Sequence, residues 1–244
     1  MDNYMLRPVG YIRSDYKEKF GIPKQCGLVD ELEQAVVFEP EFCNMDCLRD
    51  IEKFEYIWII WGFSRSRRDA GTGEAVWSPT VRPPRLGGNR RVGVWASRSP
   101  YRPNSLGLSS VRFLRIELDG KEVRSDEISG PVNGELALII SGGDMMNGTP
   151  VYDIKPYLPY SDVHEDASDG YSKGKSDPDL KVIFPEELIS IIPEEKRGGL
   201  IRILSLDPRD AYEKKEGHIY GMSFADWDIR FKVDGDTLTV VEIE

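Results

Sequence analysis

Short apolar runs with alternating polar positions recur through the first two thirds of the chain and predict a protein built mainly from β-strands. The strands predicted from this pattern are residues 6–13, 35–38, 56–63, 91–97, 108–118, 121–124 and 135–140, with Asp119-Gly120 as the turn of a hairpin before residues 121–124. Residues 56–63 (YIWIIWGF) carry apolar side chains on both faces, so we expect this strand to be fully buried. One helix is expected at residues 45–54, with Asn44 as its N-cap. Many short strands with a single early helix favour a barrel or sandwich over repeated βαβ units.

The last third of the chain has a different pattern. Residues 161–181 are rich in Asp, Ser, Gly and Lys with little to bury, which predicts a linker. The elements predicted beyond it are two helices, residues 185–192 and 199–206, and one hairpin, residues 227–243, with its turn at Asp234-Gly235. The sequence therefore predicts two domains, a mainly β domain at residues 1–168 and a small α+β domain at residues 169–244.

The most informative stretch is residues 147–160 (NGTPVYDIKPYLPY), which contains three prolines. Proline fixes φ and lacks a backbone donor, so we expect this stretch to be neither a helix nor a central strand. A stiff loop loses little entropy when it holds a ligand, which makes it a good platform for polar groups. The groups it carries are one carboxylate, one amine and three phenols, from Asp153, Lys155, Tyr152, Tyr157 and Tyr160.

Two further rigid loops share this character, residues 79–91 (PTVRPPRLGGNRR) and residues 98–108 (RSPYRPNSLGL). Together with residues 147–160 they resemble the TsaA-like (TrmO) family of S-adenosylmethionine-dependent tRNA methyltransferases. The resemblance continues at residues 23–25 (PKQ) and 207–212 (DPRDAY), so it covers nearly the whole chain. It implies a TsaA-like β-barrel that binds the cofactor and carries the chemistry, followed by the small α+β domain.

The resemblance also implies a reaction, a partner and a set of cofactor contacts. The reaction is transfer of a methyl group from S-adenosylmethionine to N6 of the threonylcarbamoyl-adenosine just 3′ of a tRNA anticodon, at position 37, by a homodimer with the cofactor near the subunit boundary. Carried over by position, the cofactor-binding residues are Pro23, Lys24, Gln25, Ser64, Arg65, Arg98, Leu108, Asn147, Gly148, Thr149 and Pro150. Many relatives have aspartate where Asn147 stands and proline where Ser105 stands. Arg98 either pairs with the methionine carboxylate or braces the neighbouring loop.

Asp153, Lys155 and Tyr157 are the candidates for catalysis. An exocyclic adenine nitrogen is a poor nucleophile, and methyl transfer to it needs alignment with the donor and often a proton acceptor. Asp153 can accept the proton, while Lys155 or Tyr157 orients a carbonyl attached to the nitrogen. The alternative is an Asp153–Lys155 ion pair that only holds the loop. Likewise, the rings of Tyr157 and Tyr160 either stack on a base or pack against the neighbouring prolines.

Charge is distributed unevenly along the chain. The net charge is −10, yet residues 65–115 contain eleven arginines, no lysine and two carboxylates, which leaves +9 there and −19 elsewhere. Arginine suits bidentate recognition of phosphate, and the acidic remainder repels unspecific polyanions. The candidate RNA-binding residues are Arg82, Arg85, Arg90, Arg91, Arg102, Tyr160 and Arg209. The alternatives are that these arginines pair with the acidic surface or bridge subunits, and that Asp207-Pro208-Arg209 stops a helix with a salt bridge.

Composition and spacing argue against several other classes. The longest apolar run is far shorter than the roughly 20 residues that span a membrane, and no signal peptide opens the chain, so we expect a cytoplasmic protein without membrane contact. Three cysteines and two histidines lack metal-ligand spacing, which predicts no metal site and disfavours histidine-based catalysis. Residues 142–144 (GGD) lead into no clear helix, so a Rossmann cofactor site is not expected. Two rival functions stay open, a non-catalytic RNA-binding or regulatory module and a methyltransferase of a small metabolite.

Overall fold

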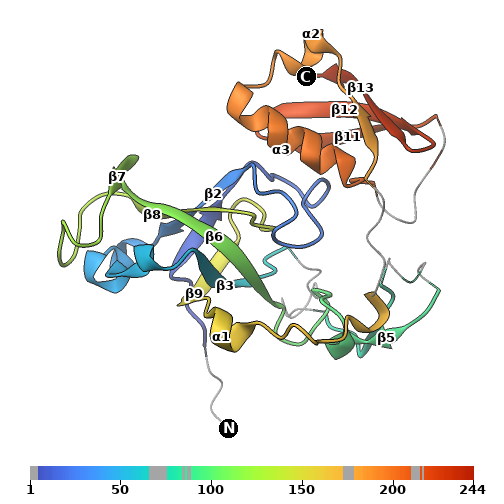
Figure 1. Ribbon diagram of the computed structural model, residues 1–244. Coiled ribbons are helices and arrows are strands. Elements are labelled where there is room, and N and C mark those ends of the chain that lie inside the picture. The colour runs from blue at the N-terminus through green and yellow to red at the C-terminus, as the bar shows by residue number, and fades with distance from the viewer. Residues whose placement is uncertain are drawn as a thin grey trace.

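The computed structural model describes residues 5–65, 76–83, 86, 89–172, 179–209, 215 and 217–244. Strands dominate the first part of the chain, and a smaller unit of helices and strands forms the last part (Figure 1). The mainly β class expected from the sequence is confirmed.

Seven strands form one sheet in the first part of the chain. They are β1 (Gly10–Arg13), β2 (Glu33–Phe38), β3 (Tyr56–Gly62), β6 (Leu106–Leu118), β7 (Lys121–Val123), β8 (Leu136–Ser141) and β9 (Pro150–Pro156). Their order is β3-β9-β1-β2-β8-β6-β7, and β3 also pairs with β6. The first six strands therefore make a closed circuit of hydrogen-bonded neighbours, the arrangement expected of a barrel. The turn at Asp119-Gly120 joins β6 to β7 with positive φ at both residues, as the sequence predicted.

β3 shows how the closed circuit separates core from surface. Ile57 and Ile59 are fully buried and belong to the core inside the circuit. On the opposite face, Tyr56 is 40% exposed and Trp58 is half-buried. The expectation that this strand is buried on both faces is therefore wrong, because its outer face borders a cavity.

The proline-rich stretch at residues 147–160 is the clearest departure from expectation. β9 lies in it and pairs with both β3 and β1, so the stretch contains a central strand after all. Pro150 and Pro156 are the first and last residues of the strand, and the five residues between them keep their donors. The third proline, Pro159, opens the short helix α1 (Pro159–Asp162), where a missing N–H costs nothing.

The helix expected at residues 45–54 is instead two 3₁₀ turns, η2 (Met45–Leu48) and η3 (Ile51–Lys53), and a third turn, η1 (Pro40–Phe42), precedes them. Asn44 does act as a cap, since its side-chain oxygen accepts the N–H of Asp46 at 3.0 Å. Asp50 has φ 69, and this left-handed residue interrupts what would have been a continuous helix.

The arginine-rich loops carry a small sheet of their own. β4 (Thr80–Val81) pairs with β5 (Val92–Gly93), after which the chain turns into η5 (Val94–Ala96), so the strand expected at residues 91–97 is only two residues long. The expected linker contains η6 (Gly170–Ser172). There, the Tyr171 hydroxyl donates to the carbonyl oxygen of Ala96 at 2.9 Å, so this part of the linker packs on η5.

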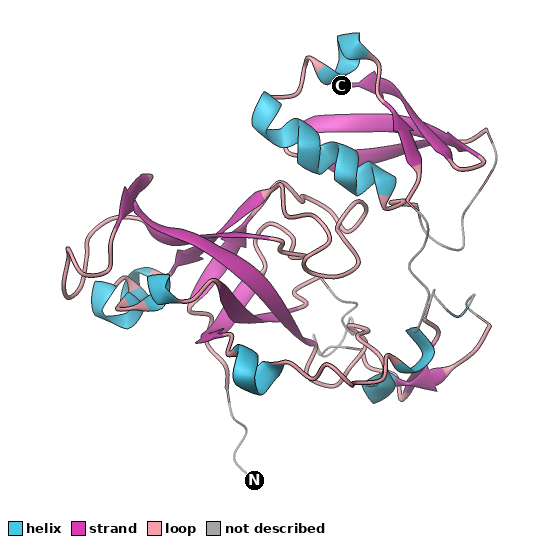
Figure 2. Ribbon diagram, in the orientation of Figure 1, coloured by secondary structure: helices cyan, strands magenta, loops and turns pink. Residues whose placement is uncertain are grey.

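The C-terminal unit is an α+β layer. Its elements are β10 (Lys181–Ile183), α2 (Glu186–Ile189), α3 (Glu194–Ser205), β11 (Ile219–Phe224), β12 (Trp227–Asp234) and β13 (Thr237–Ile243). The sheet order is β10-β13-β12-β11, and α3 lies across one face of the sheet (Figure 2). The hairpin predicted at residues 227–243 is confirmed, whereas α3 begins five residues before the predicted start.

The loop at residues 14–32 joins the two units. Its Tyr16, Val29 and Leu32 are buried in the same core as Leu200 of α3 and Phe231 of β12. Backbone hydrogen bonds hold the loop on both sides. The carbonyl oxygen of Asp15 accepts the N–H of Ala225 in the C-terminal unit at 2.9 Å. The carbonyl oxygen of Tyr16 accepts the N–H of Asn147, between β8 and β9, at 2.8 Å. The C-terminal unit therefore fixes a loop that belongs to the N-terminal sheet.

This packing predicts opposite effects for two neighbouring glycines of α3. A Cβ added at Gly199 would lie 2.2 Å from Cγ of the buried Leu32, so Gly199→Ala should push α3 away from the loop and cost about 1–3 kcal/mol of unfolding free energy. At Gly198 the nearest atom would be 3.8 Å away, so Gly198→Ala should be neutral or stabilising by up to about 1 kcal/mol. Urea unfolding of both variants measures the difference, and equal stabilities would show that the loop yields freely.

Candidate active site

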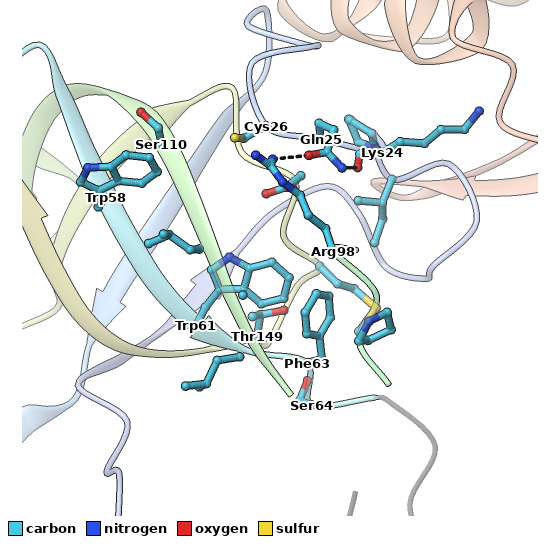
Figure 3. A pocket seen from close by; sticks show the side chains of 18 of the residues that line it. Lys24, Gln25, Cys26, Trp58, Trp61, Phe63, Ser64, Arg98, Ser110 and Thr149 are labelled. Carbon is cyan, nitrogen blue, oxygen red and sulfur yellow. Dashed lines mark hydrogen bonds between the residues drawn. The ribbon is translucent and has the colours of Figure 1, made fainter. Parts of the chain in front are cut away.

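A cavity of about 960 Å³ opens where β3 ends, β6 begins and the chain turns from β8 into β9 (Figure 3). Its size is at the upper end of the usual range for small-ligand sites, about 300–1,000 Å³. The walls are residues 22–26 of the joining loop, residues 61–65 at the end of β3, residues 97–102, residues 106–110 of β6 and parts of the turn at residues 144–149. Segments far apart in the sequence thus meet around one space.

A chain of hydrogen bonds runs from the core to the cavity wall. The Trp61 indole donates to the Ser109 hydroxyl at 2.9 Å, and that hydroxyl donates to Oδ1 of Asp144 at 2.6 Å. Trp61 fits because its partner strand has glycine at position 107, where a Cβ would lie 2.3 Å from the indole ring. The Trp61 ring in turn packs on Phe63, with centroids 4.3 Å apart. The position of the Asp144 carboxylate is therefore set by buried, well-packed neighbours.

Asp144 and Arg98 carry opposite charges in the wall, and the Cys26 thiol lies close to both. Burial raises the pKa of the Asp144 carboxyl above its ordinary value, although the Ser109 hydrogen bond and the charge of Arg98 oppose this shift. Burial, followed by the charge of Asp144, raises the pKa of the Cys26 thiol, which keeps it protonated at neutral pH. Arg98 donates to the side-chain oxygen of Gln25 (Figure 3). The wall thus presents a cation and a carboxylate within one partly desolvated space.

Eight of the eleven cofactor-binding residues expected from the resemblance line this cavity. They are Pro23, Lys24, Gln25, Ser64, Arg65, Arg98, Leu108 and Thr149. The other three shape the turn between β8 and β9. The Asn147 side chain accepts from the N–H of Ser14 at 3.2 Å, Gly148 has φ +77 and donates to Ile12 at 2.7 Å, and Pro150 pairs with Tyr11. Direct contact of these three with a ligand stays a prediction.

The three candidate catalytic residues follow one another at every second position along one face of β9 and its continuation. Tyr157 lines the cavity, and its ring packs against Trp58 and Tyr56 with centroid distances of 5.5 and 6.3 Å. Lys155 and Asp153 form an ion pair at 2.9 Å and are 60% and 51% exposed, outside the cavity lining. The ion pair that the sequence left open as an alternative is thus present, and a catalytic role for Asp153 stays a prediction.

Sequence reasoning missed several residues of this site, and Trp58 and Asp144 are two of them. Trp58 lines the cavity beside Tyr157, and its indole N–H donates to Asp162 at 2.8 Å, which fixes the ring. The sequence assigned it to a buried strand face, so no local signal distinguished it. Asp144 was noted only as the end of a glycine-rich turn. A carboxylate three residues after the buried strand β8 was the available signal.

The candidate RNA-binding residues divide into two groups. Arg90 and Tyr160 are exposed, the latter by 87%, and Arg91 donates to the Thr80 hydroxyl at 2.7 Å. Arg82 lines a second groove beside the cavity, whereas Arg85 lies outside the described residues.

Arg102 and Arg209 have internal roles. Arg102 donates to the carbonyl oxygens of Ser97 and Ser99 at 3.1 and 3.4 Å, which braces the loop. Arg209 forms a bidentate ion pair with Asp207 at 2.7 and 3.0 Å, and only 9% of its side chain is exposed. The helix-stop alternative is therefore what the structure has at Arg209, and the RNA contact expected there is not supported.

Across the described ranges, no group of three or more His, Cys, Asp or Glu side chains could hold a metal ion. No helix in the same part of the chain is long and apolar enough to cross a bilayer.

The raised pKa of Asp144 predicts how stability depends on pH. A carboxyl whose pKa rises on folding stabilises the fold below its ordinary pKa of about 4, and this contribution is lost as pH rises through the folded value. Asp144→Asn keeps an acceptor for Ser109 but cannot ionise. Relative to the original protein, its free energy of unfolding should therefore increase as pH rises above about 4, as urea unfolding between pH 4 and 8 measures.

Asp162 provides a control of opposite sign. Hydrogen bonds from the N–H of Leu158 and the indole of Trp58 hold its pKa below the ordinary value, so its contribution is present at neutral pH and lost on acidification. Asp162→Asn should therefore lose stability relative to the original protein as pH rises. Parallel pH profiles for the two variants would refute the electrostatic assignment of Asp144.

Comparisons with known proteins agree with this geometry. The model of the tRNA-methyltransferase O N-terminal domain matches residues 11–163, and that of the TrmO C-terminal domain matches residues 177–244. A relative from Escherichia coli K12 named tRNA (adenine(37)-N6)-methyltransferase is 36% identical over 252 residues, covering 100% of this chain and 99% of the relative. A putative S-adenosylmethionine-dependent methyltransferase of Pseudomonas aeruginosa PAO1 is 36% identical, covering 93% and 92%. The crystal structure of TrmO from Pseudomonas aeruginosa superposes with a TM-score of 0.71 at 27% identity, covering all of both chains. The chain belongs to the TrmO family.

Proposed function

We propose that this protein transfers a methyl group from S-adenosylmethionine to N6 of the threonylcarbamoyl-adenosine at position 37 of tRNA, 3′ of the anticodon. The observation that carries the proposal is the cavity itself, where an arginine and a partly buried carboxylate stand among aromatic walls in a chain of the TrmO family. Full-length similarity to a tRNA (adenine(37)-N6)-methyltransferase supports this substrate. The protein acts in the cytoplasm as a homodimer, with residues 1–168 as the catalytic domain and residues 169–244 as the small α+β domain.

The residues of the cavity fit the cofactor chemically. S-adenosylmethionine supplies an electrophilic methyl group on a positively charged sulfur. Arg98 binds the methionine carboxylate, for which a guanidinium is the natural partner. Asp144 provides the negative charge that an ammonium or sulfonium group requires. Trp61 and Phe63 supply aromatic surface for the adenine ring.

The acceptor side of the cavity is the outer face of β3 and β9. Trp58 and Tyr157 offer rings whose positions are fixed by Asp162 and by mutual packing, which suits a flat base. Asp153 stands on the same strand face as Tyr157 and accepts the proton that N6 loses when the new bond to carbon forms. Lys155 forms an ion pair with the Asp153 carboxylate at 2.9 Å and holds it in place.

The direct test incubates the purified full-length protein with S-adenosylmethionine, a metal chelator and tRNA that carries the threonylcarbamoyl-adenosine. We expect the methylated nucleoside to form, as detected by nucleoside mass spectrometry, and to be absent without the cofactor. The chelator should make no difference, because the chemistry is assigned to side chains. Binding of tRNA without methyl transfer would instead favour the non-catalytic module, and methylation of a small metabolite alone would favour the other rival.

A pair of substitutions distinguishes a catalytic Asp153 from a structural one. If Asp153 accepts the proton, Asp153→Asn should lower single-turnover methyl transfer about a hundredfold or more and leave cofactor affinity unchanged. Lys155→Met removes the same ion pair but keeps the carboxylate, so it should cost much less. Equal losses in the two variants would show that only the ion pair matters.

A further inference from the structure

A second groove adjoins the cavity and was not expected from the sequence. Its volume is about 1,280 Å³, and it runs between the small β4–β5 sheet, η5 and the segment at residues 168–172. The groove and the cavity share five lining residues, Lys24, Gln25, Ser97, Arg98 and Pro100. Because the shared wall includes Arg98, a bound polymer that leaves the cavity beside this arginine enters the groove directly.

The charge of the groove is opposite to that of the whole protein. Among its lining residues are four cationic side chains, Lys24, Arg82, Arg91 and Arg98, and one carboxylate, Asp169. The protein as a whole carries a net charge of −10. Two of the arginines are held in place by side-chain acceptors, since Arg91 donates to Thr80 at 2.7 Å and Arg98 donates to Gln25. A fixed cationic lining on an acidic protein selects a polyanion locally.

The groove also presents aromatic faces. Trp95 lies in η5 and is 79% exposed, and Tyr101 is 42% exposed. Tyr171 stands opposite in the lining, half-buried, with its hydroxyl fixed on the Ala96 carbonyl at 2.9 Å. Trp95 is not part of either main core. An indole exposed in this way gives up apolar burial within its own chain and is available for contact with a partner.

Cations that follow a backbone together with exposed rings are the combination that single-stranded nucleic-acid sites use. We infer that the groove binds the single-stranded nucleotides next to the target adenosine, and that the Trp95 indole stacks on one of their bases. This inference rests on the proposed function and extends it with a second binding site on the same substrate. Phosphates lie along Arg82 and Arg91, while the base faces Trp95, so the contact is tolerant of base identity.

The test compares two exposed tryptophans from the same arginine-rich part of the chain. Trp95 lines the groove, whereas Trp77 is 51% exposed and lines neither the groove nor the cavity. The probe is a fluorescently labelled anticodon stem-loop RNA that carries the threonylcarbamoyl-adenosine. We expect Trp95→Ala to weaken binding about 5- to 150-fold, which is the worth of one base stacked on an aromatic side chain. Trp77→Ala should stay within about twofold of the original protein, as a substitution outside the contact does.

Two further measurements identify the contact as stacking. The slope of log K against log salt should be unchanged in Trp95→Ala, because no phosphate contact is lost. Trp95→Phe should recover part of the affinity, since it keeps a ring. Cofactor affinity by calorimetry should be the same in all three variants. A Trp95→Ala variant that binds the stem-loop as tightly as Trp77→Ala would overturn the inference, as would a loss that Trp95→Phe does not relieve.

The outcomes for the groove and for the proposed function are separable. If the original protein methylates the tRNA and Trp95→Ala does so with the same KM, only the stacking site is wrong. If the original protein methylates no tRNA, the proposed function fails, and the inference fails with it. A raised KM for tRNA in Trp95→Ala with kcat nearly unchanged supports both, because stacking beside the reaction contributes to binding and not to the chemical step.

Discussion

The pairing of β3 with β6 is the constraint on which the rest of the N-terminal structure depends. Without it the sheet would have two open edges, and with it six strands close on themselves. Closure brings the end of β3 beside the start of β6, in the register Gly62↔Leu106. It also stacks Trp61 on Gly107 and lets the indole reach Ser109, which holds Asp144. The cavity wall is therefore a product of strand pairing, and only its loops are free to vary.

The second constraint is the loop at residues 14–32, which is held by contacts with both units. Tyr16 and Leu32 are buried against the C-terminal unit, while the tip of the same loop carries Lys24 and Gln25 to the cavity. The C-terminal unit thus supports the site from outside, and none of its described residues lines the cavity. This gives the second domain of this chain a physical role beside a closed sheet that has its own core.

What could be predicted from the sequence depended on how local the signal was. Asp119, Gly120 and Gly235 have positive φ in two hairpin turns. An Asp-Gly pair predicts such a turn from two adjacent residues, and both hairpins are present. β9 was missed because a proline is compatible with a central strand only at the strand's ends, and those ends are set by distant partners. The prediction of a helix at residues 45–54 was wrong because Asp50 adopts a left-handed conformation, which the pattern of apolar positions does not reveal.

The site residues also divide into those with a local sequence signal and those without one. Loop motifs placed residues such as Gln25, Arg98 and Thr149 on the cavity, because their resemblance to a family lies in contiguous segments. Asp144 and Trp58 could not be found in this way, since what makes them functional candidates is burial and closure, which appear only in three dimensions.

The cost of Asp144 itself is an argument for function. Holding a carboxylate in a partly desolvated wall opposes folding wherever the group is ionised, and its raised pKa records that opposition. Ser109 and Arg98 offset only part of this cost. An amide of the same shape would satisfy Ser109 without the penalty, so the hydrogen bond alone does not require a carboxylate. A cationic ligand in the cavity does require one. At position 144 a carboxylate is therefore less favourable than an amide for folding, but more favourable than an amide for binding a positively charged methyl donor.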